Sequence, residues 1–345
     1  MHMADALISP AVGGTLWAVS GGMIAFCARK VKQVMQDHLV PLMGVMGAFV
    51  FAVQMINFSI PGTGSSGHLC GGLMLAILLG PYAAFLVVAS VLTIQAFFFA
   101  DGGLLALGCN IFNMGFLPVF VAFPLYRVIA KGRHGTPRAW MASIVAAVAG
   151  LQLGAFCVVL ETTASGISEL PFGAFVLMML PIHLAIGAVE GLATATVVAF
   201  VAQARPEILQ PARDAGTTVR VRPVLIGLAV AAAIIGGAVS WLASTHPDGL
   251  EWSIFKVTGQ EEVPGGDTGI HKDLAELQEK TAFLPDYGFK ATEAEQTSHA
   301  QDSGDAWPAV NAGTSASGII GGIMTLILVV LAGLAIRLYP VRRTE

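Results

Sequence analysis

The residues best suited to chemistry stand at the start of the chain, where His2 follows Met1 directly. The α-amine of Met1, the backbone nitrogen of His2 and the His2 imidazole are joined through short covalent links. Once these nitrogens have lost their protons, they can close a five-membered and a six-membered chelate ring on one cation in one plane. Square-planar nitrogen sites suit Ni(II) or Cu(II). The alternative is that His2 is an unstructured terminal residue without a function.

The composition indicates which kind of scaffold must position these nitrogens. Of the 345 residues, 55% are hydrophobic and only 12% are charged, whereas about a quarter of the residues of a soluble domain are charged. The stretch 39–100 contains no Asp, Glu, Lys or Arg. Because a membrane helix needs about 20 apolar residues, this stretch must cross the bilayer more than once. The sequence therefore predicts an all-α polytopic membrane protein.

Apolar runs that are bounded by charged residues, Pro and Gly predict nine membrane spans. Seven come first, at 10–28, 39–60, 69–80, 82–100, 104–126, 139–160 and 174–202. Two more, at 224–243 and 319–338, flank a hydrophilic segment at about 245–317. No basic residue precedes the first apolar run, so we expect no secretory signal and a free α-amine on Met1.

The positive-inside rule orients these spans. With the N-terminus outside, the loops after the first, fifth and seventh spans and the C-terminal tail are cytoplasmic. These places hold 14 of the 18 basic residues: Arg29, Lys30, Lys32, Arg127, Lys131, Arg133, Arg138, Arg205, Arg213, Arg220, Arg222, Arg337, Arg342 and Arg343. The remaining four lie in the outer segment: Lys256, Lys272, Lys280 and Lys290. This orientation puts the N-terminus and the loop that carries His68 on the same outer side, so that His2 and His68 can meet.

Two ionisable residues inside the bilayer are further candidates. His183 and Glu190 lie seven residues apart in the seventh span, and this spacing puts them on one helix face. An intramembrane ionisable pair favours a functional role, in cation passage or in subunit coupling. The same span carries Gly187 and Gly191, which favour tight helix packing and therefore a structural buried network. Both interpretations stay open at this point.

The hydrophilic segment at about 245–317 is rich in acidic residues and contains His246, His271 and His299. One interpretation is a solvated loop. The other is an acidic antenna that raises the local concentration of cations. Elsewhere the chain lacks a phosphate-binding loop and the common hydrolase motifs, and its basic residues flank membrane spans rather than forming a nucleic-acid patch. We therefore expect no ATP hydrolysis by this chain and no nucleic-acid partner.

Four short motifs resemble those of one transporter family: Met1–Leu7, Gly67–Leu69, Pro181–Gly191 and His246–Glu251. The first three resemble the substrate-capture subunits of energy-coupling-factor transporters for nickel and cobalt. The fourth resembles the PDGLE signature of the companion subunit. The resemblance implies a fused chain: a seven-helix capture bundle at 1–205, a basic cytoplasmic linker at 206–222, and a companion domain at 223–345 whose two spans flank the outer acidic loop.

The resemblance further implies that the N-terminal segment tucks into the outer half of the bundle. The metal would be held by the Met1 amine, the His2 amide and imidazole, and His68. His183, Glu190 and His246 are possible accessory residues. A planar site of four nitrogens excludes Mg²⁺ and Ca²⁺ and disfavours tetrahedral Zn²⁺. We therefore expect Ni(II) as the cargo, with Co(II) as the alternative.

The resemblance also implies a multi-pass protein of the cell inner membrane, with an extracytoplasmic N-terminus and a cytoplasmic C-terminus. The companion portion would be needed for efficient loading. A separate transmembrane coupling subunit and two ATPase subunits would power uptake, so the chain is expected to be a transport subunit and not an enzyme, without a cofactor besides the transported ion. The alternatives are cobalt uptake for cobalamin synthesis, a stand-alone secondary carrier, and a membrane-embedded metalloenzyme that uses His183 and Glu190.

Overall fold

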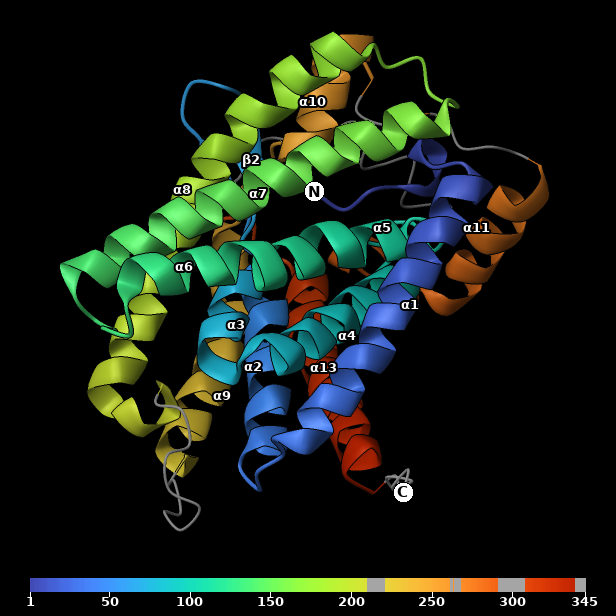
Figure 1. Ribbon diagram of the computed structural model, residues 1–345. Helices are drawn as coiled ribbons and strands as arrows, with labels where there is room; N and C mark the ends of the chain where they lie inside the picture. Colours follow the sequence, from blue (N-terminus) through green and yellow to red (C-terminus); the bar gives the residue numbers. More distant parts are fainter. Residues whose placement is uncertain (210–220, 261–262, 264–267, 291–307, 339–345) are drawn as a thin grey trace, which may run out of the picture.

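The computed structural model describes residues 1–209, 221–260, 263, 268–290 and 308–338. Most of the predicted linker, the end of the C-terminal tail and His299 lie outside the described residues. The rest is almost entirely helical (Figure 1). The N-terminus lies among the helices in one half of the molecule, while the described C-terminal end of the chain lies at the opposite end (Figure 1).

Within the described residues, six helices are long and apolar enough to cross a membrane. They are α1 (Pro10–Gln33), α4 (Pro81–Phe99), the stretch Leu107–Ala130, α7 (Pro137–Ser165), α8 (Phe172–Ala204) and α13 (Ala312–Leu338). The shorter apolar helices are α2 (Leu39–Gln54), α3 (Gly72–Leu79) and α9 (Arg222–Gly237). The predicted all-α polytopic membrane fold is confirmed, and each of the nine predicted spans overlaps one of these helical stretches.

The second predicted span is too long at its end. Helix α2 ends at Gln54, and Phe58–Ile60 forms strand β1 instead of continuing the helix. Strand β1 pairs antiparallel with β2 (Ser65–Gly67). The turn between them contains Gly62 and Gly64 at φ 77° and 75°, a conformation that favours glycine. The predicted flexible loop is therefore a hairpin, and its second strand leads directly into His68.

The fifth predicted span is a helix of changing pitch. It consists of α5 (Leu107–Ile111), the π-helical stretch η2 (Phe112–Ala122) and α6 (Phe123–Ala130). Pro118 lies inside η2, and because proline has no backbone N–H, it interrupts the regular α-helical hydrogen bonding.

Helices α7 and α8 pack against each other through the small residues of the seventh predicted span. A Cβ added at Gly191 would lie 2.4 Å from Cα of Ile144, and one added at Gly187 would lie 2.8 Å from Cα of Val148. Only glycine permits this approach of the two backbones. The close packing holds the part of α8 that carries His183 and Glu190 in a fixed position.

The companion part of the chain wraps around the capture part. Helix α13 packs along α2, where a Cβ added at Gly321 would lie 2.0 Å from the Phe51 ring. Between α9 and α13 come η4 (Val239–Leu242), α10 (Gly249–Thr258), α11 (Gly269–Thr281) and η5 (Pro285–Tyr287).

In Figure 1, helix α10 lies above the N-terminus and helix α11 lies to its right, beside α1. His271 of α11 donates a hydrogen bond of 2.9 Å to the carbonyl of Ile8. Gln278 donates at 2.8 Å to the carbonyls of Ala96 and Gly102. Over its described residues, the outer segment is thus a helical cover on the capture domain rather than a solvated loop.

Candidate metal centre

The N-terminal segment is held inside the protein by the backbone and side chains of residues 101–110. Met3 is fully buried; its backbone N–H donates to Oδ1 of Asn110 (2.8 Å), and its carbonyl accepts from Nδ2 of the same side chain (3.2 Å). Oδ1 of Asp5 accepts a hydrogen bond of 2.9 Å from the backbone N–H of Ala106. These contacts fix the direction in which Met1 and His2 enter the interior.

His68 is positioned by two other parts of the chain. The hairpin leads directly into it, and Glu190 of α8 binds the backbone that follows it. The two carboxylate oxygens of Glu190 accept hydrogen bonds from the backbone N–H groups of Cys70 (2.6 Å) and Gly71 (2.9 Å). Glu190 is buried, with 2% of its surface exposed. The side chain therefore anchors the turn that follows His68.

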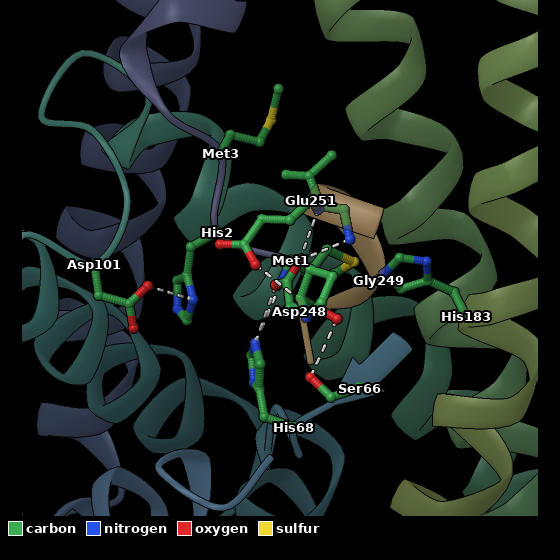
Figure 2. A network of polar contacts seen from close by, with 12 residues as sticks. Met1, His2, Met3, Ser66, His68, Asp101, His183, Asp248, Gly249 and Glu251 are labelled. Atoms are coloured by element: carbon green, nitrogen blue, oxygen red, sulfur yellow. Dashed lines mark hydrogen bonds and ion pairs between the residues drawn. The ribbon is translucent and has the colours of Figure 1, made fainter. Parts of the chain in front are cut away.

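The structure brings Met1, His2 and His68 together (Figure 2). The amine nitrogen of Met1 lies 3.2 Å from Nε2 of His68. The imidazole rings of His2 and His68 stack, with centroids 5.1 Å apart and planes that differ by 10°. Less than a tenth of each side chain is exposed, so the three residues form one nitrogen-rich cluster that is largely closed to water.

Two carboxylates outside the predicted ligand set also contact this cluster (Figure 2). Asp248, from the start of α10, forms an ion pair with the Met1 amine, and its Oδ2 lies 3.8 Å from Nε2 of His68. Oδ1 of Asp101 lies 2.9 Å from Nδ1 of His2. The PDGLE motif was the available signal for Asp248, and the end of an apolar run was the signal for Asp101.

The site's electrostatics distinguish its nitrogens. Burial lowers the pKa of His68 to about 3, and the nearby positive charges of the Met1 amine and His2 act in the same direction. Burial also lowers the pKa of the Met1 amine, but Asp248, by its charge and hydrogen bond, raises that pKa above its usual value. His68 thus presents an unprotonated imidazole at neutral pH, while the amine is held as an ammonium group beside a carboxylate.

Burial raises the pKa of the two carboxylates, but their cationic neighbours outweigh it. The Met1 ammonium, by its charge and its hydrogen bond, holds the pKa of Asp248 below its usual range. His2, through charge and a hydrogen bond, lowers the pKa of Asp101 to about 2, and the Tyr287 hydroxyl that donates to Asp101 adds to this effect. Both carboxylates are therefore anions at neutral pH.

The three possible accessory residues are differently placed. His183 is buried, and its Nδ1 bonds to the carbonyl of Met179 at 2.8 Å. It lines a cavity of about 10 Å³ together with Met1, His68 and Asp248. Glu190 contacts the backbone after His68, as described above. The side chain of His246 is exposed, and this residue reaches the site only through its backbone. His183 and Glu190 each have a backbone partner, so the structure does not bring them together as a pair.

The cluster needs one rearrangement before it can chelate a metal as predicted. In the described part of the chain, no three His, Cys, Asp or Glu side chains are arranged to hold a metal ion. The donors here include the terminal amine and a backbone nitrogen. Covalent geometry requires Nδ1 of His2 to close the six-membered ring, and that atom faces Asp101. Chelation therefore requires Nδ1 of His2 to turn away from Asp101 and the Met1 ammonium to give up a proton beside Asp248.

Known protein families match most of the chain. The family model for the cobalt uptake substrate-specific transmembrane region matches residues 2–208, and the model for the PDGLE domain matches residues 222–338. The NikMN homologue of Archaeoglobus fulgidus is 37% identical over 239 residues, which are 68% of this chain and 74% of that protein. The fused nickel transport protein NikMN of Rhodobacter capsulatus is 29% identical over 309 residues, or 83% of this chain and 88% of that protein.

The fold has a counterpart among solved structures. A crystal structure of a transition metal transporter is 28% identical to this chain, with a TM-score of 0.53, over 59% of this chain and 93% of that one. The first family model alone covers more than half of the sequence. The chain therefore belongs to the family of cobalt uptake substrate-specific transmembrane proteins, with a PDGLE domain fused behind that region.

Proposed function

We propose that this chain is the metal-binding membrane component of a nickel uptake system, with cobalt as the alternative cargo. The observation that carries the proposal is the meeting of Met1, His2 and His68 in one buried cluster. The proposed ligands are the Met1 amine, the His2 amide, Nδ1 of His2 and Nε2 of His68. Family membership and the similarity to a fused nickel transport protein support the same conclusion.

The chemistry of the donors supports a late first-row transition metal as cargo. Amine, amidate and imidazole nitrogens in one plane match the preference of Ni(II). Mg²⁺ and Ca²⁺ require oxygen ligands and higher coordination numbers, while Zn²⁺ favours a tetrahedron. Because burial keeps the His68 imidazole unprotonated, this ligand is ready to bind without losing a proton.

We propose that the chain lies in the cell inner membrane. The N-terminus and the His68 hairpin would be on the extracytoplasmic side, and the C-terminus would be in the cytoplasm. This orientation rests on the distribution of basic residues. We propose a capture domain at 1–205, a linker at 206–222 and a companion domain at 223–345. Uptake would draw its energy from a separate coupling subunit and two ATPase subunits, since the sequence has no phosphate-binding loop of its own.

A metalloenzyme built on His183 and Glu190 is a weaker proposal. Both side chains are engaged with backbone groups, His183 with Met179 and Glu190 with Cys70 and Gly71. These contacts support a role for Glu190 in holding the loop of His68.

The test is the visible absorption and the magnetic moment of the purified full-length chain loaded with Ni(II). Square-planar nitrogen ligation gives a yellow, diamagnetic centre, and this is the expected result. A paramagnetic, six-coordinate spectrum would contradict the proposed ligand set. Energy coupling is tested separately, by measuring nickel uptake in cells with and without the ATPase subunits; uptake that persists without them would favour a stand-alone carrier.

A further inference from the structure

Residues 246–252 of the companion domain lie against the hairpin that carries His68. Ser66 of β2 donates its backbone N–H to the carbonyl of Pro247 (2.8 Å) and its hydroxyl to the carbonyl of His246 (2.7 Å). The segment is thereby fixed to the same hairpin that carries His68. Its position relative to the proposed ligands follows from these backbone contacts.

Asp248 uses its two carboxylate oxygens for different purposes. Oδ1 accepts hydrogen bonds from the backbone N–H groups of Leu250 (2.7 Å) and Glu251 (3.0 Å) and so caps the N-terminus of α10. Oδ2 contacts the Met1 amine and lies 3.8 Å from Nε2 of His68 (Figure 2). Because the cap holds one oxygen, the direction of the other is fixed toward the cluster.

The two neighbouring motif residues support this placement. A Cβ added at Gly249 would lie 3.1 Å from Cε1 of His183 and 3.1 Å from Cδ1 of Ile186, so the absence of a side chain lets the segment approach α8 closely. Glu251 completes a capping box with Asp248, since its Oε2 accepts a hydrogen bond of 2.9 Å from the backbone N–H of Asp248. The motif is thus built to present one carboxylate oxygen to the cluster.

We infer that Asp248 is the counter-charge of the metal centre, so that the companion domain completes a site whose nitrogen ligands come from the capture domain. This inference rests on the proposed function and adds a residue to it. A metal dication would enter a place where the side chains of Met1 and His68 are 4% and 8% exposed. Charge buried in this way is unfavourable unless an opposite charge lies close by.

The structure shows charge pairing on both sides of the cluster. The Asp248 carboxylate, only 15% exposed, faces the Met1 ammonium, and on the other side of the cluster Asp101 faces His2. When the metal takes the place of the ammonium proton, positive charge still faces Asp248. A capture domain without its companion has the nitrogen ligands but lacks this anion, and this gives the companion a physical role in loading.

A competing role makes the opposite prediction. If Asp248 only held the Met1 ammonium, its carboxylate would compete with the incoming metal for the Met1 amine, and removing its charge would strengthen binding. If it supplies the counter-charge, removing its charge weakens binding. The direction of the change in nickel affinity therefore separates the two roles.

The experiment uses the purified full-length chain and equilibrium dialysis with Ni(II). Asp248→Asn retains a capping oxygen but loses the charge, and Asp248→Ser caps α10 without reaching the amine; both residues are good N-caps. We expect both variants to lower nickel affinity at least tenfold. The visible spectrum of the bound nickel should stay as in the wild type, because the nitrogen ligands are unchanged. Affinity within threefold of the wild type in both variants, tighter binding, or a changed spectrum would overturn the inference.

Two further variants make the result specific. Asp273→Asn removes one negative charge from the exposed surface of α11, and we expect it to leave nickel affinity unchanged. Equal losses in Asp273→Asn and Asp248→Asn would indicate a general effect of charge and contradict a specific counter-charge. His2→Ala tests the proposed function itself. Tight binding by His2→Ala would refute the ligand set, whereas its loss, together with normal binding by Asp248→Asn, would refute only the role of Asp248.

Discussion

The buried carboxylate of Glu190 accepts a hydrogen bond of 2.6 Å from the backbone N–H of Cys70, two residues after His68. Its other oxygen accepts from Gly71. Because α8 is itself held by close packing on α7, the carboxylate has a fixed position. A side chain in the predicted seventh span thus determines where a proposed metal ligand lies, without belonging to the proposed ligand set.

Glu190→Ala should therefore impair both stability and metal binding. The substitution leaves two buried N–H groups without acceptors, at a cost of about 1–3 kcal/mol for each. We expect a lower unfolding temperature and, in the fraction that folds, at least a tenfold loss of nickel affinity because His68 is no longer held in place. Thermal unfolding and equilibrium dialysis measure the two effects. Glu169→Gln, at an exposed position, is the matched control, and a folded Glu190→Ala chain with normal affinity would refute the positioning role.

Substitution of the histidines tests the ligand set directly. His2→Ala and His68→Ala each remove a proposed ligand nitrogen, and we expect each to reduce nickel affinity by a factor of a hundred or more. His246→Ala should bind normally, because that side chain is exposed and the residue contributes a backbone carbonyl. Dialysis of the three variants side by side gives the answer. Tight binding by His68→Ala would separate the hairpin from the metal site.

The sequence was sufficient to predict the class of fold and the proximity of His2 and His68. Hydropathy identifies membrane helices because each must bury its own backbone polar groups in a helix, and the distribution of basic residues places both histidines on one side. The end of α2 was predicted wrongly because Phe58–Ile60 is as apolar as a span. Only the pairing with β2 shows that it is a strand.

The carboxylates of the site could not be predicted from local pattern. Asp248 contacts Met1 across 247 positions of sequence, and Asp101 contacts His2 from the loop after α4. Spacing within a helix says nothing about such contacts. It did place His183 and Glu190 on one face, but it could not show that His183 bonds to the backbone of its own helix while Glu190 bonds to the backbone that follows His68.

An extension of the N-terminus should abolish binding. One residue placed before Met1 converts its amine into an amide and moves the new amine out of the five-membered ring. The cluster also lacks room, since Met1 is 5% exposed. We expect an uncleaved N-terminal tag to remove high-affinity nickel binding and a tag of equal length at the C-terminus to have no effect. Affinity that survives the N-terminal tag would show that the amine is not a ligand.

Nickel affinity should fall steeply in acid, and the groups responsible differ from those expected from ordinary histidine chemistry. Asp248 raises the pKa of the Met1 amine above its usual value despite burial, so the amine carries a proton throughout the range from about pH 7 to 5. The metal must displace this proton and that of the His2 amide. Burial lowers the pKa of His68 to about 3, so His68 is unprotonated in this range and adds no pH dependence.

At least two displaced protons, those of the Met1 amine and the His2 amide, make the affinity fall by more than one decade per pH unit between about pH 7 and 5. The sign follows from the raised pKa of the amine: protons compete with the metal below that pKa, and the competition grows as the pH falls. Competition with a chelator of known pH dependence, repeated at several pH values, measures the slope. A flat profile in the wild type would point to carboxylate ligands, whose protons are already lost above about pH 5.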